Sequence, residues 1–394
     1  MNLRRLLTLA VLVVVAVVLL GQVRTLLADP TIWPPDDFIE YWAAAKLTLD
    51  GSNPYDAEQL LPLQRANGRD TDEAVMMWNP PWSLAVVLPL GLFPARQAQL
   101  LWLAVNLAAV AFCGDRLWRL SGGSADRRWL GWLVAFAALP TAFALQSGQI
   151  GPLLLLGAVL FLDCRRRGWD AAAGAATVLL AVKPHLAYLV WAAILGEAVT
   201  RNRWRTVLGG AVAGLACSAL PVVFAPHVWQ HYADALGNRP PAQWVSPTPG
   251  TVLRLAFGED RFRLQFVPVV LGLGWFAWHW SRHRRTWDWA EQLPLVLLVS
   301  FVTAPYGAWP FDMVLLLPAA MALVVKGVEG GGSRAAVAGL LAVNLGCLVL
   351  NLLKITSFWF LWVSPAVLLL YVVGGRRTVA RDTVPPSPLR PVPA

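Results

Sequence analysis

The feature that most constrains this chain is a series of long apolar runs separated by short clusters of arginine. Hydrophobic residues make up 57% of the 394 residues, and charged residues make up only 14%. Charged residues make up about a quarter of a typical soluble domain, so the composition indicates an all-α, polytopic membrane protein. The net charge of +9 does not point to nucleic acid, because the basic residues lie between the apolar runs, where they set topology.

We expect a single integral-membrane domain over residues 1–377 with about twelve spanning helices. The expected spans cover roughly residues 6–27, 97–117, 129–145, 150–162, 171–182, 186–199, 207–224, 264–280, 293–303, 311–325, 335–353 and 358–373. The alternative for the first run is a cleaved signal peptide, with Arg4 and Arg5 before the apolar residues. We prefer an uncleaved helix, because the run is long enough to span and many further spans follow.

Residues 83–93 are apolar but too short to cross a bilayer. Eleven helical residues rise about 16 Å, against a hydrocarbon core of roughly 30 Å. We therefore expect them to lie flat on the outer surface or to form a re-entrant piece. Nearly every arginine cluster then falls on the cytoplasmic side, with both termini inside, as in a multi-pass protein of the cell membrane.

The same assignment predicts two larger outer loops, at residues 28–95 and 226–262. Residues 378–394 are rich in proline and should form a disordered cytoplasmic tail. The first outer loop carries the densest acidic cluster, and carboxylates next to a bilayer are costly to desolvate. Its residues 38–49 favour a short helix, which a turn at residues 51–54 would end.

Unusual polar residues gather on the expected outer face of this arrangement. They are Asp36, Asp37, Glu40, Asn79, Gln146, Gln149, Lys183, His185, Arg254 and Asp312. Asp37 lies in the first turn of the expected helix, and Tyr41 follows one turn later on the same face. A site open to both the membrane and the outside suits a lipid-linked anion and a polar second substrate.

Several of these residues also have purely structural interpretations. Asp36 or Asp37 could cap the helix, and Lys183 could extend its ammonium to the membrane interface. Gln146 and Gln149 could form a turn, and Arg254 could be an ordinary loop charge. Tyr41 could be an anchor at the membrane interface. The sequence alone leaves both sets of interpretations open. No residue pattern requires a metal or another cofactor, and we expect none.

The motifs of the first outer loop resemble those of glycosyltransferase family 87, also called the DUF2029 group, within the GT-C superfamily. The first match runs from Asp37 through Tyr41 to Ala44 and Ala45, with a later Gly-Ser-Asn-Pro-Tyr-Asp at residues 51–56. Further matches follow in order at residues 79–81 (Asn-Pro-Pro), 146–149 (Gln-Ser-Gly-Gln) and 181–184 (Ala-Val-Lys-Pro). The resemblance covers roughly residues 36–320.

The resemblance implies a hexosyltransferase that uses a polyprenyl-phosphate sugar, commonly of mannose, with Asp37 as the catalytic base. The acceptor would be a glycolipid or an envelope glycan outside the membrane, and nucleic acid would have no part. Some relatives carry a histidine after Ser-Trp in the loop before the tenth helix. Here that loop reads Pro-Tyr-Gly-Ala-Trp-Pro-Phe-Asp over residues 305–312, so the histidine is absent and Asp312 is the candidate substitute.

The expected site has three parts. Asp37 is the expected catalytic residue; Lys183, His185 and Arg254 are expected at the donor phosphate; and Asp36, Tyr41, Asn79, Gln146, Gln149 and Asp312 are expected around the substrates. The mechanism would be an inverting direct displacement, in which a carboxylate takes the acceptor proton and cations offset charge on the departing phosphate.

Two other function classes remain open at this level. A transporter or flippase would also need many helices, but its polar groups should lie near mid-membrane, often between internal repeats, and no repeat is evident. A non-catalytic scaffold would not require Asp37, Lys183 and the outer loops to converge.

Overall fold

The structure is a computed structural model that describes residues 32–238, 244–330 and 332–374, together with Gly21, Thr25 and Asp29. The described residues form helices and connecting turns without a β-strand, which confirms the predicted all-α class. The expected first span at residues 6–27 lies almost wholly outside the described residues. The expected tail at residues 378–394 lies wholly outside them.

The segment that we expect to form the first outer loop folds as a group of short helices. These are α2 (Phe38–Leu49), α3 (Ala57–Arg65), η1 (Pro81–Ser83), α4 (Leu84–Val87) and η2 (Leu88–Leu92). Helix α2 has the predicted bounds, and Gly51, at φ +71°, follows its end. The 81–92 segment is a broken run of single turns, and the Trp42 indole N–H fixes its end to α2 by donating to the Phe93 carbonyl at 2.9 Å.

The middle of the chain forms a series of longer helices. They are α5 (Ala95–Leu120), η3 (Ala125–Arg127), α6 (Trp129–Ala137), α7 (Leu139–Ser147), α8 (Gly151–Arg166), α9 (Asp170–Leu180), η4 (Pro184–Leu186), α10 (Tyr188–Arg201), α11 (Trp204–Phe224) and α12 (Val228–Asn238). The expected single helix at residues 129–145 is instead bent by 66° between α6 and α7. Pro140 explains the break, because it lacks the N–H that a continuous helix would bond four residues back.

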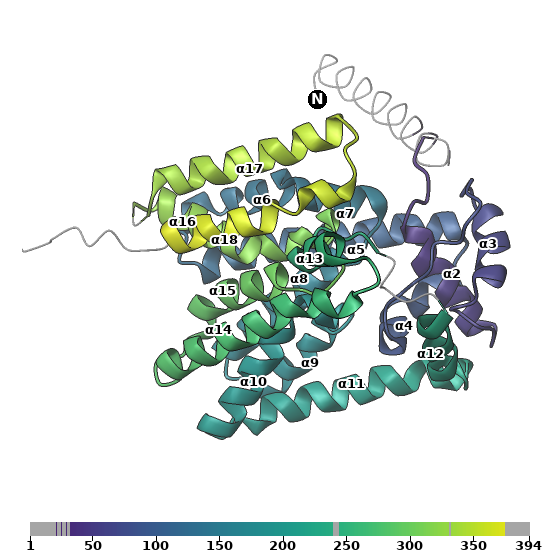
Figure 1. The fold of residues 1–394 in the computed structure, drawn as a ribbon, viewed down its shortest axis with the longest axis horizontal. Helices are drawn as coiled ribbons and strands as arrows, with labels where there is room; N and C mark the ends of the chain where they lie inside the picture. Colours follow the sequence, from purple (N-terminus) through teal and green to yellow (C-terminus); the bar gives the residue numbers. More distant parts are fainter. Residues whose placement is uncertain are drawn as a thin grey trace, which may run out of the picture.

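The remaining elements complete the bundle. They are α13 (Pro249–Phe257), η6 (Phe262–Phe266), α14 (Val267–His283), α15 (Trp289–Val302), η7 (Pro310–Leu316), α16 (Leu317–Val328), α17 (Arg334–Leu352), η8 (Ser357–Phe360) and α18 (Val363–Gly374). In Figure 1, α2, α3 and α12 lie together at one end of the molecule, and α16, α17 and α18 lie toward the other.

Five helical stretches in the described part of the chain are long and apolar enough to cross a membrane. They are Ala95–Leu120, Trp204–Phe224, Pro310–Val328, Arg334–Leu352 and Ser357–Gly374, and the bent pair α6 and α7 would make a sixth. Several apolar helices thus mark a membrane protein. The count of about twelve spans stays a prediction, since helices such as α9 and α15 are shorter than a full crossing.

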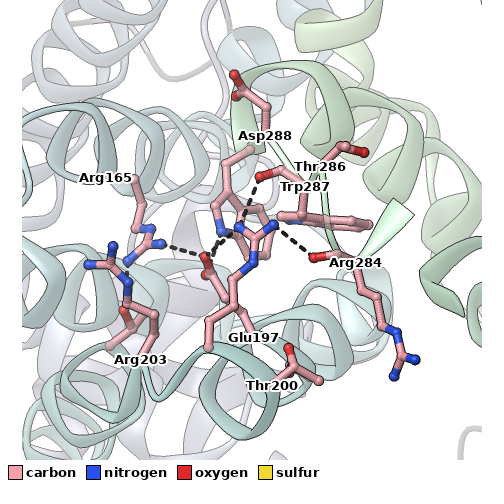
Figure 2. Close-up of polar contacts among 12 residues, drawn as sticks. Arg165, Glu197, Thr200, Arg203, Arg284, Thr286, Trp287 and Asp288 are labelled. Carbon is pink, nitrogen blue, oxygen red and sulfur yellow. Dashed lines mark hydrogen bonds and ion pairs between the residues drawn. The ribbon is translucent and has the colours of Figure 1, made fainter. Parts of the chain in front are cut away.

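A cluster of paired charges, here called the Arg165 cluster, joins α8, α9, α10 and α15 at the end of α8 (Figure 2). Its members are Arg165, Asp170, Glu197, Arg201, Arg203 and Trp289. Arg165 bonds Asp170 and, at 2.8 Å, Glu197, and Arg203 bonds the second oxygen of Asp170 at 3.0 Å. The Trp289 indole donates to the second oxygen of Glu197 at 2.8 Å.

Candidate active site

The site begins at Asp37, the residue that precedes α2. Asp37 occupies the N-cap position, but its side chain makes no capping hydrogen bond. Its Oδ2 instead accepts a bond of 3.0 Å from the Nε2 of Gln149, which lies 112 residues later in the chain. One turn along α2, the Tyr41 hydroxyl donates to the Oε1 of Gln149 at 2.7 Å. The side chains of Asp37 and Tyr41 thus hold the nitrogen and the oxygen of the buried Gln149 amide.

Gln149 reaches this position because the turn between α7 and α8 passes very close to α2. Gly148 adopts φ +71°, and a Cβ on it would lie 2.6 Å from the Cβ of Phe38. A side chain is excluded there both by the left-handed backbone and by the contact. The Trp102 indole fixes the same turn by donating to the Gly148 carbonyl at 2.6 Å. The Gly-Gln turn therefore sets the distance between Gln149 and Asp37.

Lys183 and Asp312 complete the network on the other side of Gln149. The Lys183 ammonium lies 2.6 Å from Oδ1 of Asp312 and donates to Oε1 of Gln149 at 3.3 Å. The other oxygen of Asp312 accepts the Trp309 backbone N–H at 3.2 Å. Asp312 is fully buried and the Lys183 side chain is 11% exposed, so this ammonium is held inside the protein. We call Asp37, Tyr41, Gln149, Lys183 and Asp312 the Gln149 network.

The network borders a cavity of about 500 Å³, a size that fits small-molecule substrates. Its lining includes six polar or charged residues: Glu40, Asn79, Gln149, Lys183, His185 and Asp312. The lining also includes eight aromatic residues: Trp78, Tyr232, Trp244, Phe262, Phe266, Tyr306, Trp309 and Phe311. Asp37 is half-buried and stands beside this lining, one hydrogen bond behind Gln149.

Aromatic rings from three separate segments of the chain pack against one another in this lining. Trp244 meets Trp78 edge-on at a centroid distance of 5.7 Å and meets Tyr306 edge-on at 6.0 Å. Tyr306 in turn packs on the His185 ring at 4.7 Å. Edge-on packing of this kind fixes the rings against one another. These aromatic lining residues, here called the aromatic wall, adjoin the polar ones, because Tyr306 packs on His185 and the Lys183 ammonium lies 4.9 Å from the centre of the Phe311 ring.

Burial shifts the proton equilibria of three groups near the cavity. Burial, and then the charge of Asp37, raise the pKa of Glu40 to about 8. Burial, and then Lys183, lower the pKa of His185 to about 3, so this imidazole is neutral at neutral pH. Asp36 is exposed as a residue, but partial desolvation of its carboxyl and then the charge of Asp37 raise its pKa to about 6, against an opposing effect of Arg69. A neutral His185 would meet a phosphate by hydrogen bonding rather than by charge.

The structure brings most of the predicted site residues together. Asp37, Tyr41, Gln149, Lys183 and Asp312 form the network described above. Asn79 and His185 line the cavity, and the Asn79 amide donates to the Val182 carbonyl at 3.0 Å. The Nε2 of His185 is buried without a hydrogen-bond partner among the described atoms.

Three predicted residues lie away from the cavity lining. Asp36 is exposed, and its carbonyl accepts a bond of 3.2 Å from Arg69. Gln146 is exposed near the end of α7. Arg254 is buried in α13, where its guanidinium donates to the Trp244 carbonyl at 2.7 Å. Arg254 therefore contacts the segment that carries an aromatic ring of the site.

Two features of the site had no assigned role at the sequence level. Glu40 was recognised as an outer-face acid, but its burial and its place in the cavity were not anticipated. The aromatic wall is the second feature, because the sequence assigns no site role to its tryptophans or tyrosines. The available signals were the position of Glu40, three residues after Asp37, and the repeated aromatic residues in both outer loops.

Comparisons with known proteins agree with the chemistry of this site. No curated protein and no solved structure matches the chain. The sequence model of glycosyltransferase family 87 matches residues 78–305, more than half of the chain, which includes Gln149 and Lys183 and ends before Asp312. The chain belongs to glycosyltransferase family 87.

Proposed function

We propose that the protein transfers a hexosyl group, most simply mannosyl, from a polyprenyl-phosphate donor to a lipid or envelope-glycan acceptor. The supporting observation is the arrangement around one amide. Gln149 bonds the Asp37 carboxylate at 3.0 Å through its nitrogen and the Lys183 ammonium at 3.3 Å through its oxygen. A base and a cation thus stand on opposite sides of a fixed group at the edge of a substrate-sized cavity.

In this proposal Asp37 takes the proton of the acceptor hydroxyl while that oxygen attacks the anomeric carbon. The new C–O bond forms as the bond between the anomeric carbon and the phosphate oxygen breaks. The phosphate leaves with the bonding electrons, so the configuration at the anomeric carbon inverts. Lys183 offsets the charge that develops on the departing phosphate.

The aromatic wall supports a carbohydrate substrate. The face of an aromatic ring is electronegative, so it attracts the polarised C–H groups on the apolar side of a sugar ring. The polar lining residues offer hydrogen-bond donors and acceptors to the hydroxyl groups of the sugar. The lining carries five Trp and Tyr rings, whereas its large aliphatic residues are Met76, Val182 and Leu236.

Position on the outer face of the cell membrane forms part of the proposal. The cavity lies at the start of α8 and the end of α9, whereas the Arg165 cluster lies at the opposite ends of the same two helices. Arginine clusters favour the cytoplasmic side of a membrane, so the cavity would face outward.

A transfer assay tests the whole proposal. Purified protein is reconstituted in sealed vesicles with externally added radiolabelled polyprenyl-phosphate sugars and a lipid extract. We expect one donor to give a labelled product of inverted configuration, and the Asp37→Asn variant to give almost none. Transfer from a nucleotide sugar but from no polyprenyl-phosphate sugar would refute the donor class.

A further inference from the structure

Glu40 is a buried carboxyl group that has no role in the proposed mechanism. It lies on α2, three residues after Asp37, and is 8% exposed. Unlike Asp37, Glu40 is part of the cavity lining. Its Oε1 lies 3.5 Å from the Nε2 of Gln149, which is at the limit of a hydrogen bond. Within the described residues it forms no ion pair.

The charged groups around Glu40 disfavour a second negative charge. Asp37, the N-cap of α2, repels the ionised form. A hydrogen bond from Tyr41 would favour the ionised form, but the Tyr41 hydroxyl donates to Gln149 at 2.7 Å. Lys183, from the segment after α9, and Arg69, from the loop after α3, also favour the ionised form. However, Lys183 already pairs with Asp312 of η7 at 2.6 Å, and Arg69 already donates a hydrogen bond of 3.2 Å to the Asp36 carbonyl. Three other titratable residues line the cavity and are neutral at pH 7: His185, whose pKa is lowered by burial, and Tyr232 and Tyr306, whose pKa values are raised by burial.

A buried carboxyl without a cationic partner keeps its proton, because the ionised form loses its hydration. Its pKa of about 8 means that the carboxyl is mainly protonated at pH 7. A protonated carboxyl is a hydrogen-bond donor as well as an acceptor. Glu40 can therefore donate a hydrogen bond to a ligand in the cavity.

We propose that Glu40 is a proton-bearing carboxyl that donates its O–H to a hydroxyl oxygen of the sugar held beside Asp37. A phosphate oxygen is a poorer fit at this position, because it would place a second anion next to Asp37. The inference rests on the proposed function, since it takes the ligand to be a sugar. Ionisation of Glu40 removes the donor and adds a charge beside the base, so activity should fall as the pH rises past about 8.

The test compares the pH dependence of kcat/KM in the wild type and in Glu40→Gln. An amide still donates an N–H but cannot ionise. We expect the wild type to lose activity about tenfold per pH unit above the pKa of Glu40. Glu40→Gln should lack this alkaline loss and should be about 2- to 10-fold less active at pH 7, and Glu40→Leu, which cannot donate, should lose about 10- to 100-fold.

Glu58→Gln is the matched control, because Glu58 is an exposed glutamate in the neighbouring α3 and its variant should keep the alkaline loss. Infrared difference spectra give a second readout that is independent of activity. The C=O stretch of a protonated carboxyl should vanish in Glu40→Gln and persist in Glu58→Gln.

Two outcomes would overturn the inference. A Glu40→Gln protein as inactive as Asp37→Asn at every pH would mean that the Glu40 carboxylate itself is required. An unchanged alkaline loss in Glu40→Gln would assign the titration to another group. Failure of the proposed function is a separate result, in which Asp37→Asn keeps full transfer activity.

Discussion

The Gln149 network and the Arg165 cluster lie at opposite ends of one helical hairpin. Gln149 precedes α8 and Lys183 follows α9, whereas Arg165 lies at the far end of α8 and Asp170 begins α9. Helix α8 has 16 residues, so roughly 24 Å of helix separates the two groups. Both place charged side chains within an apolar bundle, and they do so in different ways.

In the Arg165 cluster every carboxylate oxygen accepts a bond from a fixed donor. Asp170 takes one from Arg165 and one from Arg203, and Glu197 takes one from Arg165 and one from Trp289. In the Gln149 network, by contrast, Asp37 accepts from a neutral amide, and it pairs with no cation among the described residues.

This difference separates a structural role from a chemical one. A buried charge whose partners are all supplied within the protein ties its helices together, and losing one partner leaves an uncompensated charge. A carboxylate that is only partly satisfied, beside a cavity, is available to a substrate. The two ends of the hairpin thus predict different consequences of mutation.

The largest expected effect is that of Asp37→Asn on catalysis. The substitution keeps the size of the side chain and an oxygen that can accept the bond from Gln149, and it loses no capping bond because Asp37 makes none, but it removes the proton acceptor. Loss of a general base typically lowers the rate by about 10²- to 10⁴-fold. We expect the variant to fold normally, as judged by gel filtration and thermal unfolding, and to lose transfer activity by this factor.

Asp36→Asn is the internal control for that experiment. Asp36 is the preceding residue, but it is exposed and lies outside the cavity lining. Its variant should keep most of the activity. Equal activity of the two variants would remove Asp37 from the mechanism, and failure of Asp37→Asn to fold would favour a structural role at the start of α2.

The next effect concerns stability and belongs to the Arg165 cluster. Arg165 is 10% exposed, so Arg165→Ala leaves Asp170 and Glu197 short of a buried cation. Breaking a buried pair in this way costs about 3–5 kcal/mol. We expect a lower unfolding temperature in nanodiscs, with unchanged activity per folded molecule. Reduced kcat in the protein that remains folded would show that the two ends of the hairpin are coupled.

Arg203→Ala provides the matched comparison, because it removes the other arginine that bonds Asp170. The Arg203 side chain is 53% exposed, and an exposed ion pair contributes only about 0–1 kcal/mol. Its variant should therefore unfold close to the wild-type temperature. A loss as large as that of Arg165→Ala would mean that burial does not control the strength of these pairs.

Local features of the site could be predicted from the sequence. The bounds of α2 and the shared face of Asp37 and Tyr41 follow from helical periodicity and from the Gly51 turn, which involve neighbouring residues only. The gathering of Asp37, Gln149, Lys183 and Asp312 at one end follows from the topology, because alternating helices return to the same side.

The pairings themselves could not be predicted, because they depend on tertiary packing. Nothing in the sequence indicates that Lys183 bonds Asp312, which lies 129 residues away, or that Gln149 rather than Gln146 faces the cavity. The burial of Glu40 is equally non-local, since residues of other segments cover it. The break between α6 and α7 is a different case, because Pro140 stands in the sequence inside the expected continuous span, where a proline favours a break.

A third effect, smaller than those expected for Asp37 and Arg165, concerns Lys183, to which we assign two separate functions. Lys183 would contact the donor phosphate, and it also neutralises the buried Asp312. Loss of a charge-assisted bond to the phosphate should lower kcat/KM for the donor by about 10- to 100-fold, with little change in acceptor KM. We expect this result for Lys183→Ala in transfer assays in which each substrate is varied in turn.

The double variant Lys183→Ala/Asp312→Asn separates the two functions. Replacing Asp312 by Asn removes the carboxylate that Lys183→Ala leaves unpaired, so any loss of stability should be recovered. Donor use should stay impaired, because the missing contact is with the substrate. Restored donor use in the double variant would mean that Lys183 serves only to neutralise Asp312, and the Gln149 network would then resemble the Arg165 cluster at this pair.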